Sequence, residues 1–233
     1  MRELAAKFLL LPALAFAPLS SPTQDLGPDA LLRAVTTEVT GALKQEQGFQ
    51  PPDPAKIAGV VESRVVPLFD FTRMTRLAMA RNWRLATPEQ QAMVTAEFKT
   101  LLVRTYSSAL AQYRGEVISF KQLRAVPFAD DVTVRSEVEQ AGKERVIVDY
   151  HMEKTPAGWR IYDVKVGGVR LVTTYRDVFA EKIREGGVDG LLKFLADGNR
   201  GIRSRFNSVK NSFWEKSRIM FAVFRDIVTT SRQ

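Results

Sequence analysis

The chain has 233 residues, 45% of them hydrophobic and 26% charged, with no cysteine and a formal net charge of +8. This length suits one large domain or two small ones, and the lack of cysteine excludes disulfides, thiolate nucleophiles and zinc–thiolate sites. The basic charge is typical of proteins that bind nucleic acid or anionic membranes, but the sequence has no zinc finger, helix-turn-helix or nucleic-acid-binding sheet motif, so we expect no nucleic-acid partner.

The N-terminus, residues 1–20, has the pattern of a signal peptide. Arg2 and Lys7 precede an apolar segment, Phe8–Phe16, and alternating alanines up to Ala17 offer small-residue cleavage patterns. The segment is shorter than the roughly 20 apolar residues that a membrane-spanning helix needs. We therefore expect export, with an uncleaved anchor as the alternative.

Helical periodicity follows from Asp29 to Lys44, where apolar residues recur at Leu32, Val35, Val39 and Leu43. A proline-rich loop at residues 51–54 ends this pattern. Residues 55–84 then predict two or three short helices, broken at Pro67 just before Phe69.

A long amphipathic helix is predicted from Pro88 to Tyr113. Thr87 and Gln90 form a Thr-x-x-Gln capping box, and Pro88 suits the first helical position. One face of this helix contains Val94, Phe98, Leu101, Leu102, Thr105, Tyr106, Ala109 and Tyr113. Periodicity allows two interpretations of this face, a packed core helix or the wall of an apolar cavity.

Four strands are predicted next, at residues 116–123, 131–138, 145–152 and 159–166, the last entered from a turn at 156–158. On the third strand, Val146, Val148, Tyr150 and Met152 share one face, and Ile147, Asp149 and His151 share the other. The first of these faces, together with Tyr162, Val164 and Val166 on the fourth strand, is expected to lie against Leu102, Tyr106 and Leu110 of the long helix.

Helices return at residues 172–184 and 188–195, separated by Gly186 and Gly187. Helices, then antiparallel strands, then helices indicate an α+β fold with a four-stranded sheet curling over the long helix. Residues 198–233 are then predicted to form a basic amphipathic helix, with eight basic and two acidic residues. Its apolar stripe contains Ile202, Phe206, Val209, Phe213, Met220, Phe224 and Ile227. This extension could pack on its own domain, grip a partner helix or lie on an anionic membrane surface.

Residues with catalytic or metal-binding potential are few. His151 is the only histidine, and no metal-ligand spacing or phosphate-binding glycine loop is present, so we expect no catalytic residue, no metal site and no cofactor. Gly167 and Gly168 predict a turn. Asp70 and Asp163 are interpreted as N-caps or as residues that hold neighbouring backbone.

Two blocks of sequence resemble the MlaC family of periplasmic phospholipid-binding proteins, also called the toluene-tolerance family. The first contains VPLFDFTRM, NWRLATPEQ and LLVRTYSSAL, and the second contains WRIYDVKVGGVRLVTTYRDVF and GGVDGLLKFL. The resemblance covers residues 30–195. Two features depart from the family: Arg170 replaces a small polar residue, and the extension after residue 197 has no family counterpart.

The resemblance implies a sheet like that of nuclear transport factor two, with a helical subdomain, in a lipid-binding domain at residues 29–197. In the family the acyl chains lie inside the domain and the head group lies outside. The matching motif positions are Tyr106, Val146, Tyr162 and Val169. Together with the residues expected between sheet and helix, the expected lipid-binding set is Phe71, Leu102, Tyr106, Leu110, Val146, Val148, Tyr150, Tyr162, Val164 and Val169.

The resemblance further implies a periplasmic carrier that moves phospholipid between an outer-membrane lipoprotein complex and an inner-membrane ABC transporter complex. Head-group selectivity is expected to be weak, apart from attraction between phosphate and basic residues at the opening. A carrier of hopanoid or other lipids is the alternative within the family. An isomerase-like enzyme that uses a buried aspartate as base is the alternative on the same scaffold.

Overall fold

The structure is a computed structural model that describes residues 26–47, 54–110, 115–123, 129–139 and 144–200. The predicted signal peptide lies outside these residues, as does the predicted C-terminal helix from residue 201 onward. Within the described ranges, no helix has the length and apolar character needed to cross a membrane.

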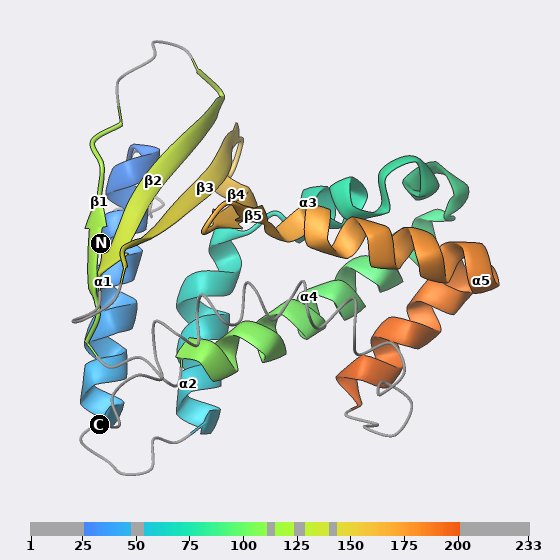
Figure 1. Cartoon of the computed structure of the whole chain (residues 1–233), viewed down its shortest axis with the longest axis horizontal. Helices are drawn as coiled ribbons and strands as arrows, with labels where there is room; N and C mark the ends of the chain where they lie inside the picture. Colours follow the sequence, from blue (N-terminus) through green and yellow to red (C-terminus); the bar gives the residue numbers. More distant parts are fainter. Residues whose placement is uncertain (1–25, 48–53, 111–114, 124–128, 140–143, 201–233) are drawn as a thin grey trace, which may run out of the picture.

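The first half of the chain is helical (Figure 1). Its elements are α1 (Pro28–Gln47), α2 (Pro54–Val60), the π-helical turn η2 (Val61–Val65), the 3-10 turn η3 (Val66–Leu68), α3 (Phe71–Met79), the 3-10 helix η4 (Ala80–Leu85) and α4 (Pro88–Leu110). The capping box at the start of α4 is confirmed, since the Thr87 amide donates to Gln90 Oε1 at 3.0 Å and the Gln90 amide donates to Thr87 Oγ1 at 3.2 Å. Asp70 is the N-cap of α3, as predicted, and accepts from the Arg73 amide at 2.7 Å.

The sheet is antiparallel and has five strands in the order β1-β2-β3-β4-β5, one more than predicted. The strands are β1 (Val117–Phe120), β2 (Asp131–Glu139), β3 (Val146–Thr155), β4 (Gly158–Val166) and β5 (Val169–Arg170). Strand β5 was not predicted, because two residues are too few to show an alternating pattern. Gly167 and Gly168 form the predicted turn before it, both at positive φ, which glycine adopts without steric cost.

Helix α5 (Leu171–Asn199) crosses the far end of the molecule and bends sharply (Figure 1). The bend lies at Gly186 and Gly187, where the backbone leaves helical geometry, so the two predicted helices are confirmed as two arms of one kinked element. Tyr175 and Phe179 of α5 pack edge-on against Phe98 of α4, with ring centroids 4.8 and 5.0 Å apart. These aromatic rings form the centre of the main hydrophobic cluster.

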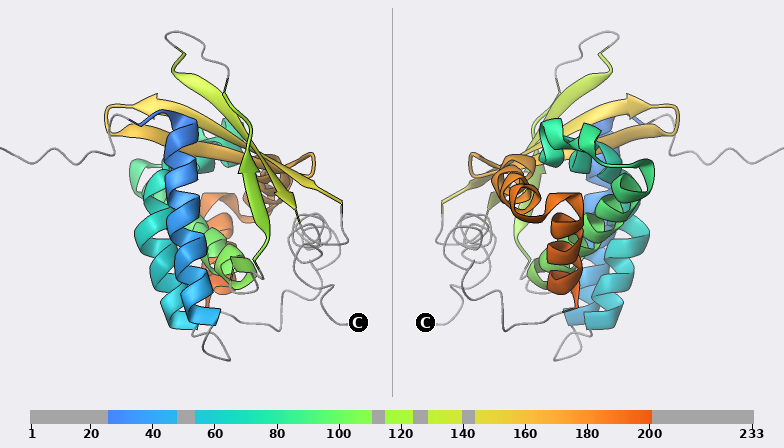
Figure 2. Two further views of the ribbon diagram at one scale, coloured as in Figure 1. Left: turned by 90° about the vertical axis from the view of Figure 1, so that its left-hand side faces the viewer. Right: turned by 90° about the vertical axis from the view of Figure 1, so that its right-hand side faces the viewer.

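Helix α1 belongs to two smaller clusters, separate from the main one. Its N-terminal half packs Leu31 and Leu32 against the sheet residues Val134, Met152 and Ile161. Its C-terminal half packs Val39 and Leu43 against Ile57 of α2, and the two helices lie side by side in both views of Figure 2. The buried apolar residues of the domain thus form three clusters.

Candidate functional site

A cavity of about 290 Å³ lies where the three clusters meet. Helix α1, the η2–η3 segment, the start of α3, the C-terminal half of α4 and the inner face of the sheet all contribute to its wall. The described residues that line it are Leu32, Val35, Thr36, Val39, Thr40, Leu43, Val61, Val65, Val66, Leu68, Phe69, Phe71, Met74, Leu102, Val103, Tyr106, Ser107, Glu116, Ile118, Val138, Val148, Tyr150, Ile161, Val164, Val166 and Leu171. The wall is therefore almost entirely apolar.

Helix α4 serves both roles that its periodicity left open. Its first half is packed core, since Val94 and Phe98 are completely buried. Its second half lines the cavity through Leu102, Val103 and Tyr106. The change from core to cavity wall occurs along one continuous apolar face, so periodicity could not have revealed it.

Six of the ten expected lipid-binding residues line the cavity: Phe71, Leu102, Tyr106, Val148, Tyr150 and Val164. Val146 is instead partly buried against the main cluster. Val169 lies on β5, paired with Val166, and is not among the lining residues. Leu110 ends α4, and its side chain lies outside the described part of the structure.

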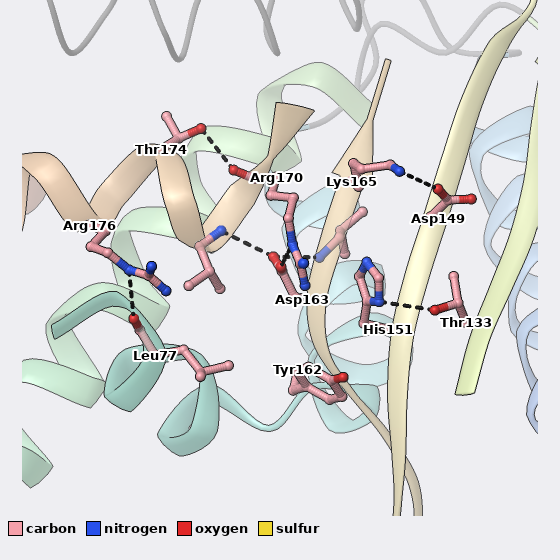
Figure 3. Close-up of polar contacts among 12 residues, drawn as sticks. Leu77, Thr133, Asp149, His151, Tyr162, Asp163, Lys165, Arg170, Thr174 and Arg176 are labelled. Atoms are coloured by element: carbon pink, nitrogen blue, oxygen red, sulfur yellow. Dashed lines mark hydrogen bonds and ion pairs between the residues drawn. The ribbon is translucent and has the colours of Figure 1, made fainter. Parts of the chain in front are cut away.

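Tyr162 lies on the opposite face of the sheet from the one predicted. His151 pairs with Asp163 and Met152 pairs with Ile161, so Tyr162 is an extra residue that forms a β-bulge in β4. Its hydroxyl donates to Asp131 at 2.8 Å, and its ring lies on the outer face with that of His151 (Figure 3). Strict alternation had placed Tyr162 with Val164, and the bulge breaks that alternation.

Several lining residues had not been assigned to a site. The α1 stripe of Leu32, Val35, Val39 and Leu43 was predicted as a helix face and here faces the cavity. The η2–η3 segment adds Val61, Val65, Val66 and Leu68. A π turn followed by a 3-10 turn has neither the helical nor the strand period, so the only sequence signal for this wall was the apolar run around Pro67.

Polar groups in the wall are few. Burial, together with the neighbouring Tyr175, raises the pKa of the Tyr106 hydroxyl well above its usual value, and burial also raises the pKa of Tyr150. Both phenols are thus neutral near pH 7. Glu116 is the one charged residue among the described lining residues, and no lysine or arginine is among them.

The buried aspartates of the sheet lie outside the cavity wall and hold the fold together (Figure 3). Asp163 accepts from the amides of Val164 and Val172 at 2.9 and 3.1 Å and from Arg170 Nε at 2.7 Å, so it caps the start of α5. The predicted role of Asp163 in holding neighbouring backbone is confirmed. Arg170, which the sequence indicated as a departure from the family pattern, forms an ion pair with Asp163.

His151 and Asp149 do not form an acid–base pair. Asp149 is engaged by Arg135 at 2.6 Å and by Lys165 at 3.0 Å, and His151 Nδ1 lies 3.0 Å from Thr133 Oγ1. Burial, together with the positive charge of Arg170, lowers the pKa of His151. The histidine is therefore a neutral residue of the outer face, away from the cavity.

Comparisons with known proteins found similar sequences and a similar structure. The family model described as "MlaC protein" matches residues 33–197. Toluene tolerance protein ttg2D from Pseudomonas putida is 25% identical over 192 residues, which cover 81% of this chain and 87% of that protein. A phospholipid-binding protein from Ralstonia solanacearum, solved in complex with a phospholipid, has 38% sequence identity and a TM-score of 0.69, covering 76% of this chain and 98% of its own. Because the family model spans well over half of the sequence, the chain belongs to the MlaC family.

Proposed function

We propose that this protein is a phospholipid carrier that holds acyl chains in the cavity between α1, α4 and the sheet. The observation that carries the proposal is the almost wholly apolar wall of a 290 Å³ cavity, in a chain similar to a protein solved with phospholipid bound. Neither an activated nucleophile nor an acid–base pair lies in the described part of that wall. The site therefore suits binding and release of a lipid better than chemical conversion.

Burial of an acyl chain supplies the binding free energy. Each methylene removed from water contributes about 0.8 kcal/mol, so a chain of about 16 carbons contributes more than 10 kcal/mol. A bilayer offers the same chain a similar apolar environment. Transfer between a membrane and the cavity is then nearly balanced, and the protein needs no ATP for it.

The carrier is proposed to work in the periplasm. The signal-peptide pattern of residues 1–20 and membership of the MlaC family support export. By the same resemblance, its partners are an inner-membrane ABC transporter complex and an outer-membrane lipoprotein complex. The direction of transport then depends on these partners, because binding in the cavity has no energy source of its own.

Native mass spectrometry of the protein purified without detergent tests this function. We expect a co-purifying phospholipid in a fixed ratio to protein, identified after denaturation by its mass and fragments. A protein that is empty when purified and that takes up no lipid from liposomes would refute the proposal. Recovery of a hopanoid instead would favour the other lipid class.

A further inference from the structure

Charged residues lie side by side across the outer face of the sheet, the face opposite the cavity. Arg135 of β2 is paired with Asp149 of β3, and Asp149 is paired with Lys165 of β4. Lys165 is paired in turn with Arg170 of β5. The amide of Lys121, just after β1, donates to the Arg135 carbonyl at 2.9 Å and extends this row by one strand. Because residues paired in this way project from the same face, the four cations, Lys121, Arg135, Lys165 and Arg170, form one cationic row.

The cations of the row are exposed, whereas the carboxylates that pair with them are buried. Arg135 and Lys165 bind Asp149 at 2.6 and 3.0 Å, and the side chain of Asp149 is only 2% exposed. Arg170 binds Asp163, whose side chain is 3% exposed, at 2.7 Å (Figure 3). The side chains of the three cations are 35–50% exposed. The surface of the sheet therefore carries positive charge along the row.

Both arginines keep hydrogen-bond donors for a ligand. In contacts between described residues, Arg135 donates through Nε and Nη2 to Asp149, and Arg170 donates through Nε to Asp163. A guanidinium group has five N–H donors, so Nη1 of Arg135 and both Nη groups of Arg170 are left to bind another group. Because the buried carboxylates already hold the two side chains, a second carboxylate binds them with little further loss of side-chain entropy.

The length of the cationic row suits a peptide segment. Adjacent strands are about 4.8 Å apart, so Arg135 and Arg170 lie roughly 14 Å apart across three strand spacings. A single small anion cannot reach both arginines, whereas a segment with several carboxylates can. Ile147, on the same face of β3 as Asp149, is 41% exposed and adds an apolar contact beside the charges. Arginines together with apolar contacts are typical of protein interfaces.

The sheet separates the cationic row from the cavity. The alternate residues of the same strands, Val148, Val164 and Val166, line the cavity. A bilayer on the outer face would therefore lie where lipid cannot reach the cavity without passing through hydrogen-bonded strands. A protein on this face leaves the other sides of the domain free. This choice of a protein over a membrane rests on the proposed function.

We propose that the cationic row docks an acidic segment of a partner protein while the cavity remains free for lipid. Carboxylates of the segment bind Arg135 and Arg170, and the two lysines of the row add attraction. Arg170, a departure from the family pattern in the sequence, is thus a binding residue of this surface as well as the partner of Asp163.

A titration followed by NMR tests the inference on the full chain. A short oligoglutamate peptide is added to the 15N-labelled protein, and the dissociation constant is read from the backbone amides of β2 to β5. Reading it there keeps binding at the basic residues 201–233 out of the measurement. We expect saturable shifts in these strands. Their absence in the unmodified protein would overturn the inference without any variant.

Variants identify the cations that bind. Arg135→Gln/Arg170→Gln should weaken binding at the sheet about tenfold, the effect of one charge-assisted hydrogen bond. Arg170→Ser leaves Arg135 and Asp149 paired, and it should weaken binding about threefold even if the double variant folds poorly. Arg81→Gln/Arg84→Gln is the matched control, since it removes the same charge from exposed positions of η4 and should change binding less than about twofold. Equal losses in the two double variants would overturn the inference.

Vesicles distinguish this surface from a membrane site and from the proposed function. Loss of co-sedimentation with phosphatidylglycerol vesicles in Arg135→Gln/Arg170→Gln, with peptide binding unchanged, would overturn the inference in favour of a membrane surface. Lipid uptake from liposomes should be the same in every variant, because none of these arginines lines the cavity. Failure of the unmodified protein to take up lipid would refute the proposed function, while the peptide titration still decides whether the row docks an acidic segment.

Discussion

Substitution of two valines on α4 can show whether the interior is a cavity or a packed core. Val94 and Val103 both lie on α4, but Val94 is completely buried in the main cluster whereas Val103 lines the cavity and belongs to none of the described clusters. Replacement by tryptophan adds about seven non-hydrogen atoms at either position. In a packed core such an insertion costs about 1–3 kcal/mol or more, so Val94→Trp should lower the free energy of unfolding by at least that amount.

Val103→Trp should behave differently, because the cavity has room for the indole. We expect a loss of stability below about 1 kcal/mol, since no packed neighbour has to move. The indole takes space from the ligand, and the loss of about four buried methylenes weakens lipid binding by about 3 kcal/mol, or about 150-fold.

The assay combines urea unfolding of delipidated protein with lipid uptake from liposomes. The reasoning predicts a crossed result, in which Val94→Trp mainly loses stability and Val103→Trp mainly loses lipid. If Val103→Trp destabilises the protein as much as Val94→Trp does, the interior at α4 is packed, and the carrier proposal loses its structural basis.

Three further predictions follow from the outer face and the tail. Tyr162→Phe should leave the amount of lipid per protein unchanged in native mass spectrometry, because Tyr162 lies outside the cavity wall. Tyr150→Ala should reduce lipid retention, because it removes contacts from the cavity wall. Equal effects of the two substitutions would contradict the assignment of Tyr150 and Tyr162 to opposite faces of the sheet. The pKa of His151 is lowered by its burial and by Arg170, so the folded state favours the neutral imidazole. The contribution of His151 to stability is therefore lost as the pH falls from about 6.5 through its folded-state pKa. The free energy of unfolding of His151→Gln should depend less on pH in this window, and an unchanged pH profile would contradict the direction of the pKa shift. If the basic tail, residues 201–233, docks on membranes, its deletion should abolish salt-sensitive co-sedimentation with anionic vesicles. A large fall in melting temperature with unchanged vesicle binding would show instead that the tail packs on the domain.

Local signals in the sequence predicted most of the elements. The capping box at Thr87 and Gln90, the N-cap at Asp70 and the paired glycines of α5 each act within a few residues, so their outcome can be inferred without knowing the rest of the fold. The inward face of β3 also follows from simple alternation, since Val148 and Tyr150 line the cavity as their period indicates.

The remaining features depend on contacts between distant residues. The bulge that turns Tyr162 outward is a property of the pairing between β3 and β4, and β5 exists only because the chain turns back on β4. The cavity exists because α1 packs in the two smaller clusters and not in the main one. An apolar residue such as Leu102 has the same pattern in sequence whether it faces another side chain or an open space.

The division of the hydrophobic interior into separate clusters has a consequence for local opening. Helix α1 is held by two small clusters and faces the cavity between them. Few buried contacts correspond to a low free energy of local unfolding, so the amide hydrogens of α1 should exchange faster with solvent than those of α4 and α5 in the empty protein. A lipid that fills the cavity touches α1 and the main cluster at once and joins them into one cooperative unit. Slower amide exchange in α1 on loading would then report occupancy of the cavity directly, residue by residue.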